Sequence, residues 1–257
     1  EVLIMNNLLH ANIVRLWKNK LFWFGSLFML LYGIFKMLTE YKSSVMLGED
    51  LNLDDILFVY AFITGIISAI FVSFFAGTEY SDGTIRNKII VGHARFKVYL
   101  SNLITNILAV SFMCFIYILV ILVAGTPLLG SLRIEISQAL KIIFSSFLLI
   151  TSYCSIYTFF SMLCHNKAIS VAICVVASFL SLFTEAYIGS MLSLPDYYTG
   201  VKRTVLGFLF NYLPSGQAYQ YMSMQFGDLN LKMLCLAAIS CIATITGMVF
   251  FQKKDIK

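Results

Sequence analysis

Six long apolar stretches constrain what this chain of 257 residues can fold into. They are residues 21–38, 56–77, 98–125, 139–163, 168–191 and 231–251. A helix needs roughly 20 apolar residues to cross the hydrocarbon core of a bilayer. Inside that core every backbone polar group must be bonded within the protein, which favours helices over open strands. The sequence therefore predicts an all-α polytopic membrane protein with six membrane-spanning helices.

Charged residues are too few to cover a water-exposed globule of this size. They make up 12% of the chain and hydrophobic residues 60%, whereas an ordinary soluble domain is about 25% charged. This composition excludes a soluble enzyme, a disordered chain and a collagen-like chain, and the length fits one domain, residues 1–257. The first stretch is longer than the core of a cleaved signal peptide, roughly 7–15 residues, so we expect it to be retained.

Lysine and arginine are distributed unevenly between the two ends of the predicted bundle. If successive spans alternate in direction, the side that holds both termini carries 11 of the 18 Lys and Arg residues. These are Arg15, Lys18, Lys20, Arg86, Lys88, Arg95, Lys97, Lys167, Lys253, Lys254 and Lys257. The positive-inside rule places that side in the cytoplasm. We expect both termini to be cytoplasmic, and the net charge of +5 to reflect topology rather than nucleic-acid binding.

The segment before the first span is amphipathic. In residues 5–20, Leu9 and Ile13 follow helical spacing on an apolar face, whereas Asn12 and Arg15 belong to a polar face. This pattern predicts an elbow helix that lies in the cytoplasmic membrane interface. The alternative is a basic flank that only fixes the orientation of the first span.

Two segments on the outer side also stand out. Residues 39–55 are rich in acidic side chains and predict a solvated loop. Residues 192–230 are too long for a simple hairpin loop, and within them residues 204–213 are apolar but only about half a span long. Residues 214–216, Pro-Ser-Gly, interrupt that run, which predicts a re-entrant or interfacial element before the sixth span.

The cytoplasmic loop 78–97 joins the second and third spans and predicts a short helix. Ser81 or Asp82 can cap its start, because orphan backbone amides at a helix N-terminus need an acceptor. Asp82 and Arg86 have the i, i+4 spacing of an ion pair, and Gly92 can end the helix in a left-handed conformation.

This predicted helix has two different faces. Ile85 and Ile89 lie four residues apart and form an apolar face, while Arg86, Asn87 and Lys88 are expected to face water or a partner. Because the helix connects directly to two spans, a force applied to it would move both of them.

The same loop resembles the membrane subunit of ABC-2 type ABC transporters. In that family the loop after the second span carries an acid, three residues, then Gly-Thr and an aliphatic residue. Here these are Glu79 and residues 83–85, and residues 89–90 match the aliphatic pair that follows. The predicted elbow helix, six spans, coupling helix, re-entrant segment and cytoplasmic termini also resemble the family over the whole chain.

The chain departs from the family pattern at two places. Arg86 stands where many members have an acid, and residues 92–93, Gly-His, stand where many have a proline. The form Gly-Thr-Ile-Arg-Asn-Lys resembles a Gram-positive branch that is associated with peptide export and peptide-antibiotic immunity.

The resemblance implies a permease subunit in a bacterial plasma membrane. Two copies of the chain, or one copy and a sister permease, would pair, and two soluble ATPase subunits would dock beneath them. The sequence itself has no G-x-x-x-x-G-K-[ST] phosphate loop, so ATP and Mg would be bound by the partner ATPase. The expected ATPase-coupling interface consists of Glu79, Tyr80, Asp82, Gly83, Thr84, Ile85, Arg86, Asn87 and Lys88.

The same resemblance suggests export of a hydrophobic or amphipathic peptide, such as a secreted toxin or bacteriocin. More loosely, the chain resembles exporters of phenol-soluble-modulin type. A role in immunity against a peptide antibiotic, export of lipids or drugs, and a stand-alone channel remain alternatives. Membrane lipids are expected partners, and nucleic acids are not.

Three polar residues inside the spans are candidates for a substrate path or gate. Glu185 lies near the outer end of the fifth span, where a carboxylate is costly; alternatively it reaches headgroups or pairs with Lys141 or Lys202. Asn102 and Asn106 give the third span a polar face, which suits either helix packing or a cavity lining.

An intramembrane enzyme is the rival class. Such chemistry needs Glu and His, or His, Arg and Asp, to converge at membrane depth. His10, His93 and His165 all fall at the cytoplasmic edge, far from Glu185. The six cysteines form no C-x-x-C pair either, so we expect no catalytic, cofactor or metal site in this chain.

Overall fold

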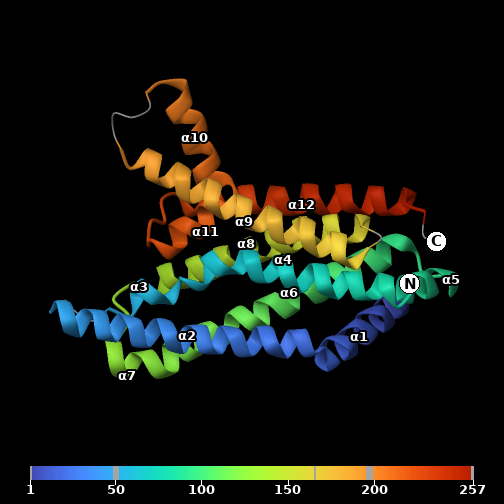
Figure 1. Ribbon diagram of the computed structural model, residues 1–257, viewed down its shortest axis with the longest axis horizontal. Helices are drawn as coiled ribbons and strands as arrows, with labels where there is room; N and C mark the ends of the chain where they lie inside the picture. Colours follow the sequence, from blue (N-terminus) through green and yellow to red (C-terminus); the bar gives the residue numbers. More distant parts are fainter. Residues whose placement is uncertain (1, 49–51, 165, 195–198, 256–257) are drawn as a thin grey trace.

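The computed structural model describes residues 2–48, 52–164, 166–194 and 199–255, and all regular structure in these residues is helical (Figure 1). The helices are α1 (Val2–Lys18), α2 (Lys20–Leu47), α3 (Asp54–Leu57), α4 (Tyr60–Ser81), α5 (Thr84–Ile90), α6 (Arg95–Val120), the π-helical turn η1 (Ile121–Gly125), α7 (Thr126–Leu129), α8 (Ile136–Leu163), α9 (Lys167–Leu192), α10 (Val201–Tyr212), α11 (Pro214–Met222) and α12 (Leu229–Lys253).

Within the described residues, six helical stretches are long and apolar enough to cross a membrane, as predicted. They are Lys20–Leu47, Asp54–Ser81, Arg95–Leu129, Ile136–Leu163, Lys167–Leu192 and Leu229–Lys253. The third of these runs from α6 through η1 into α7. The chain therefore has the character of a transmembrane protein with an all-helical fold.

The predicted solvated loop 39–55 is corrected in two ways. Its first part is helical, since α2 continues to Leu47 and ends at Gly48. Its last part contains Asp54, which is buried because its carboxylate accepts hydrogen bonds from the backbone N–H groups of Arg133 and Ile134, at 3.0 and 3.1 Å. Residues 49–51 lie outside the described residues.

Helix α4 lies at the centre of the bundle. In its most apolar stretch 78% of the residues are buried, against 22% to 56% in the other five spans. It packs against α8 and α9, while α2 packs against α6, and α12 against α8. Small residues allow this close approach: a Cβ on Gly65 would lie 3.1 Å from the Tyr153 ring.

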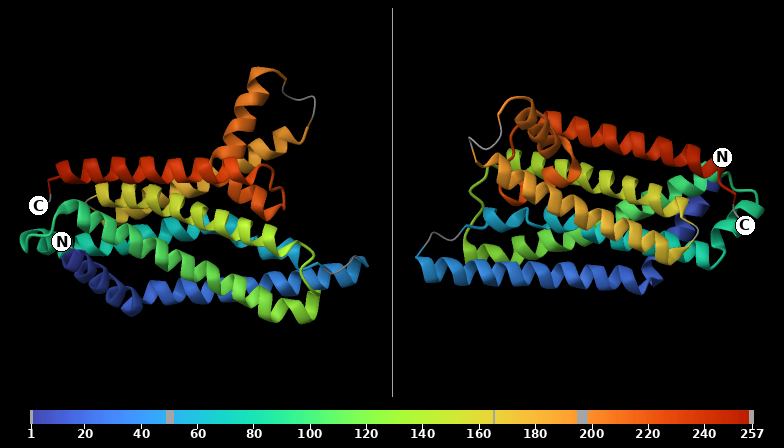
Figure 2. Two further views of the ribbon diagram at one scale, coloured as in Figure 1. Left: turned by 180° about the vertical axis from the view of Figure 1, so that it is seen from behind. Right: turned by 45° about the horizontal axis from the view of Figure 1, so that its top comes forward.

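The two ends of the bundle differ in what they carry. Both termini and α5 lie at one end, whereas α3, α7, α10 and α11 lie toward the other (Figures 1 and 2). Placing both termini on one side agrees with an even number of spans. The assignment of that side to the cytoplasm rests on the distribution of Lys and Arg.

Helices α10 and α11 form a tight hairpin before the last span. Leu213 is extended between them, and Pro214 occupies the first turn of α11, where its missing N–H costs nothing. The Gln220 amide donates to the Phe210 carbonyl at 2.8 Å, and Lys232 of α12 donates to the Gln220 side chain at 2.5 Å. The break predicted at residues 214–216 is confirmed, but it starts a second helix rather than a loop.

Gly216 makes the close approach of α10 and α11 possible. A Cβ at this position would lie 2.1 Å from the Phe210 carbonyl oxygen, so Gly216→Ala forces the two helices apart. We expect it to lower the stability of the chain by about 1–3 kcal/mol, as overpacking typically does. The measurement is the midpoint of thermal unfolding in detergent.

Gly207→Ala in the same hairpin is the matched control. Nothing lies within 4 Å of a Cβ on Gly207, so this change should be neutral or stabilising by up to about 1 kcal/mol. Equal effects of the two substitutions would contradict the tight contact.

Candidate functional site

A buried carboxylate organises the end of the bundle that carries α5 and the termini. Glu79, in the last turn of α4, is only 1% exposed. It forms salt bridges with Arg15 of α1 and Lys88 of α5, both to its Oε1 atom. The Asn102 side chain of α6 donates to its Oε2 atom at 2.7 Å. One side chain thus holds four helices together, and we call these four residues the Glu79 cluster.

Arg15 reaches Glu79 because α1 lies obliquely across this end of the bundle (Figure 1). Its guanidinium carbon is 3.7 Å from the centre of the Phe75 ring. Burial lowers the pKa of Arg15, and the Glu79 carboxylate opposes that shift by favouring the charged guanidinium. Asn19 ends α1 and caps α2 by accepting from the Leu21 N–H at 2.8 Å.

Lys88 faces the interior, which corrects the prediction that it faces water or a partner. Besides Glu79, it donates to the Asn12 side-chain oxygen at 2.9 Å, and Asn12 donates to the Ser101 hydroxyl at 3.2 Å. Asn12 is therefore buried, with 1% exposure, and belongs with Arg15 to the packed side of α1 rather than to a solvated face. Buried partners on α4, α5 and α6 make these polar residues face inward.

A glycine turn separates α4 from α5. Gly83 has a φ of +66°, in the left-handed region, and occupies the N-cap position of α5 without a side-chain cap. The predicted caps are therefore wrong: Asp82 ends α4 instead, and Ser81 lies in its last turn. Asp82 and Arg86, both described, form no salt bridge with each other, so the predicted i, i+4 ion pair is not found. The Thr84 hydroxyl donates to the Glu79 carbonyl at 3.0 Å and fastens the turn.

Helix α5 has the two faces that the sequence predicts, apart from Lys88. Ile85 is fully buried, and Ile89 packs against the core. Arg86 and Asn87 are exposed, and Ile90 and the following residue Val91 are 70% and 78% exposed. Gly92 follows with a φ of +98°, so the predicted glycine ending of the helix is confirmed.

A second set of contacts ties the C-terminal residues to the same end. The Tyr80 hydroxyl donates to the Met162 carbonyl at 2.5 Å. The Lys254 ammonium donates to the Tyr80 hydroxyl and the Met162 carbonyl, both at 2.8 Å, and to the Cys164 carbonyl at 3.2 Å. Arg95, at the start of α6, donates in turn to the Lys254 carbonyl at 2.5 Å. We call the contacts of Tyr80, Arg95 and Lys254 the C-terminal clamp.

The remaining polar candidates lie apart from this end or bridge helices. Asn106 of α6 donates to the Thr158 hydroxyl of α8 at 3.0 Å and is fully buried, so it acts as a contact between helices. Glu185 of α9 is 2% exposed, and the Ser215 hydroxyl of α11 donates to its Oε1 atom at 3.2 Å. Of the alternatives for Glu185, a salt bridge with Lys141 or Lys202 is not found, and its described partner is the Ser215 hydroxyl.

Among the predicted site residues the structure brings together Glu79, Lys88 and Asn102, whereas Glu185 contacts Ser215 of α11 instead. The sequence pattern does not predict the roles of Asn12, Ser101 and Lys254. For Asn12 a signal was available, because Leu8, Asn12 and Leu16 are spaced four apart and share one helix face. Comparison with known protein families and with curated proteins gave no match to this chain.

Removing the charge of Glu79 tests the cluster. Glu79→Gln leaves the Arg15 and Lys88 cations partly buried without a counter-charge, so we expect a loss of about 3 kcal/mol in stability. Hydrogen exchange should also accelerate in α1 and α5, which the cluster joins. Asp82→Asn makes the same chemical change at an exposed position and should stay within about 0.5 kcal/mol of the parent. A similar effect of both substitutions would contradict the cluster.

The C-terminal clamp predicts a pH dependence. Burial lowers the pKa of Lys254 from 10.5 to about 8. The unfolded chain therefore binds this proton more tightly than the folded chain, and the folded state is favoured as the pH rises above about 8. This contribution is complete above 10.5 and is lost as the pH falls through about 8.

Lys254→Met removes that titration. We expect the unfolding midpoint of the parent chain to rise relative to that of the variant when the pH is raised from about 8 toward 10.5. A constant difference between the two proteins over this range would contradict a buried ammonium in the clamp.

Proposed function

We propose that this chain is the membrane subunit of an ATP-driven exporter of the ABC-2 type, in which α5 receives force from separate ATPase subunits. The observation that carries the proposal is the anchoring of α5. Helix α5 has only seven residues and is joined to two spans. Its Lys88 side chain forms a salt bridge with Glu79 of α4 and a hydrogen bond with Asn12 of α1, while the opposite side of the helix is exposed.

This anchoring suits the transmission of force. Only the short chain segments 82–83 and 91–94 connect α5 to its two spans, so displacement of α5 is passed directly to α4 and α6. The Glu79 cluster adds α1 to the same unit. Because packed interiors are stiff, a unit held by buried charges moves as one body.

The exposed edge of α5 suits a soluble partner. Arg86, Asn87, Ile90 and Val91 combine a cation, an amide and two aliphatic side chains at the end of the molecule. We assign docking of the ATPase to this edge, whereas Glu79, Ile85 and Lys88 position the helix from inside. The turn that precedes α5 is formed by residues around Gly83, namely Tyr80, Asp82, Gly83 and Thr84.

The rest of the assembly follows from the same proposal. Two such chains, or this chain and a sister permease, would form the pathway in a bacterial plasma membrane, with both termini in the cytoplasm. Two ATPase subunits would bind ATP and Mg, and this chain would hold no cofactor of its own.

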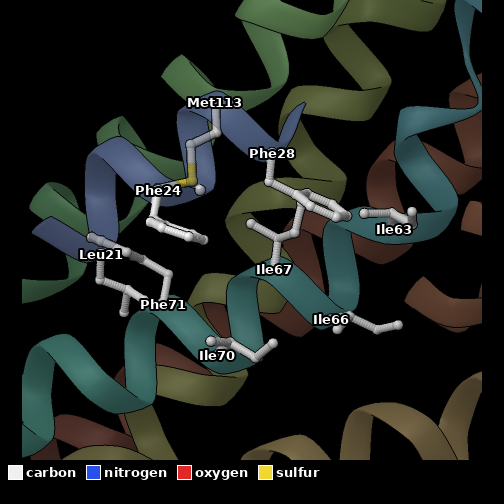
Figure 3. A pocket seen from close by; sticks show the side chains of 10 residues that line it. Leu21, Phe24, Phe28, Ile63, Ile66, Ile67, Ile70, Phe71 and Met113 are labelled. Carbon is white, nitrogen blue, oxygen red and sulfur yellow. The ribbon is translucent and has the colours of Figure 1, made fainter. Parts of the chain in front are cut away.

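An apolar cavity supports a hydrophobic or amphipathic peptide as the substrate. It has a volume of about 250 Å³ and lies between α2, α4 and α6 (Figure 3). The ten residues that line it carry no polar side chain; they are Leu21, Phe24, Gly25, Phe28, Ile63, Ile66, Ile67, Ile70, Phe71 and Met113. Such a lining favours apolar side chains over sugars or ions. Export of a toxin peptide or bacteriocin, or immunity by expelling one, would both use it.

The first experiment asks whether an ATPase binds. The detergent-solubilised chain is used to pull down an ABC ATPase encoded beside it, and the complex is assayed for vanadate-sensitive ATP hydrolysis. We expect Arg86→Glu to reduce binding at least tenfold, about 1.4 kcal/mol, because the charge on the exposed edge is reversed.

Lys253→Glu is the matched control, since Lys253 is also exposed at this end but lies on α12. Equal loss of ATPase binding in both variants would show a general effect of charge and would contradict docking on α5. An intact chain with no associated ATPase would favour the stand-alone immunity protein or channel.

A further inference from the structure

Glu185 is a second buried carboxyl group, and its surroundings differ from those of Glu79. It lies toward the end of α9, a helix against which α11 packs (Figure 1). It is 2% exposed, and the Ser215 hydroxyl of α11 donates to its Oε1 atom at 3.2 Å. Its Oε2 atom is buried with no hydrogen-bond partner in the described part of the chain. Glu79 is bound by two cations and an amide, whereas the described partner of Glu185 is a neutral hydroxyl.

Within the described residues, no cation pairs with Glu185. The helices that pack against α9 are α4, α8, α10 and α11. Helix α11 has no charged residue, and α4 has none before its last turn. Helices α8 and α10 carry Lys141, Lys202 and Arg203, and α9 itself carries Lys167 at its opposite end. The salt bridges found among the described residues both belong to the Glu79 cluster, so none of these cations compensates Glu185.

The titratable groups that face Glu185 from neighbouring helices are phenols. Tyr153 of α8 lies within electrostatic range of the Glu185 carboxyl group and is buried. Its hydroxyl also has no hydrogen-bond partner among the residues that the structure describes. Tyr219 of α11 lies about one helical turn farther along α9, because a Cβ on Gly189 would be 3.5 Å from its ring. A neutral phenol carries no positive charge, so neither tyrosine balances an ionised carboxylate.

This setting favours the neutral acid at Glu185. A carboxylate that is buried without a cation has lost its hydration and gained no counter-charge, so such a group keeps its proton. A carboxyl group that is exposed to water at neutral pH is ionised instead. The Oε2 atom can carry the proton while Oε1 accepts from Ser215. Protonation of Glu185 and packing of α11 on α9 are therefore linked, and each favours the other.

We propose that Glu185 is a proton-binding site that links pH to the contact between α9 and α11. With α11 packed on α9, Glu185 holds a proton; when the contact opens and water enters, the proton passes to water and the carboxylate becomes hydrated. Because the packed state binds the additional proton, acid favours packing and a rising pH favours opening. A movement of α11 away from α9 is thus accompanied by release of one proton. This inference does not depend on the proposed transport function.

The first test detects the proton directly. The full chain in dodecyl maltoside, a detergent without a carbonyl group, is examined by infrared spectroscopy at a pH of about 7, where exposed carboxyl groups are ionised. A protonated carboxyl group has a carbonyl stretching band that an ionised one lacks. We expect this band in the parent chain and its loss in Glu185→Gln. Asp82→Asn, the matched change at an exposed acid, should retain the band.

Ser215→Ala gives a second readout of the same site if Glu185→Gln does not fold. This variant removes the donor to Oε1, so the band should remain and shift to higher frequency as the carbonyl loses a hydrogen bond. A parent chain without the band at this pH would overturn the proposal. So would a band that neither Glu185→Gln nor Ser215→Ala changes.

The second test asks whether the proton is linked to the helix contact. Hydrogen exchange of the α11 amides is measured in the full chain and corrected for the intrinsic pH dependence of exchange. From a pH of about 7 to about 9, protection of α11 in the parent should fall by up to about tenfold per pH unit, the effect of one linked proton, and should fall less in Glu185→Gln. Lys232, which donates to Gln220 of α11, is present in both chains, so the difference between them reports Glu185. An equal pH dependence in the two chains would contradict the linkage.

Discussion

The buried charge of Glu79 is the constraint on which one whole end of this molecule depends. A carboxylate that leaves water loses several kcal/mol of hydration, so it is retained only with compensating partners. Here those partners are Arg15, Lys88 and Asn102, and each comes from a different helix. The positions of α1, α5 and α6 relative to α4 are therefore set by a single side chain, and neutralising that side chain affects all of them together.

The two sides of α5 differ in what they contact. Inside, ionic and hydrogen-bonded contacts position the helix; outside, Arg86, Ile90 and Val91 remain available to a partner. The left-handed Gly83 makes this division possible, because it follows the end of α4 at Asp82 and redirects the chain into α5 within one residue. The C-terminal clamp joins the same end to α8 and α12 through Lys254.

The six spans could be predicted because apolar length alone decides them. The predicted spans 139–163 and 168–191 agree with α8 and α9 to within a few residues. The site was less predictable. The polarity of Asn12, Arg15 and Lys88 alone predicts solvated faces, because the partners that bury them lie up to 89 residues away along the chain. Asp54 was placed in a loop for the same reason, although backbone N–H groups 79 and 80 residues away bury it.

The Glu79 cluster also bears on how the chain is assembled during synthesis. All of its members precede residue 103, so the cluster can close once α6 has entered the membrane, before α8 to α12 are translated. The C-terminal clamp can form only at the end of synthesis, because the Tyr80 hydroxyl accepts from Lys254, which lies 174 residues later in the chain. The buried Glu79 carboxylate can therefore be paired before the C-terminal half is made, and ribosome-bound chains that end after α6 should already protect α5 from proteases.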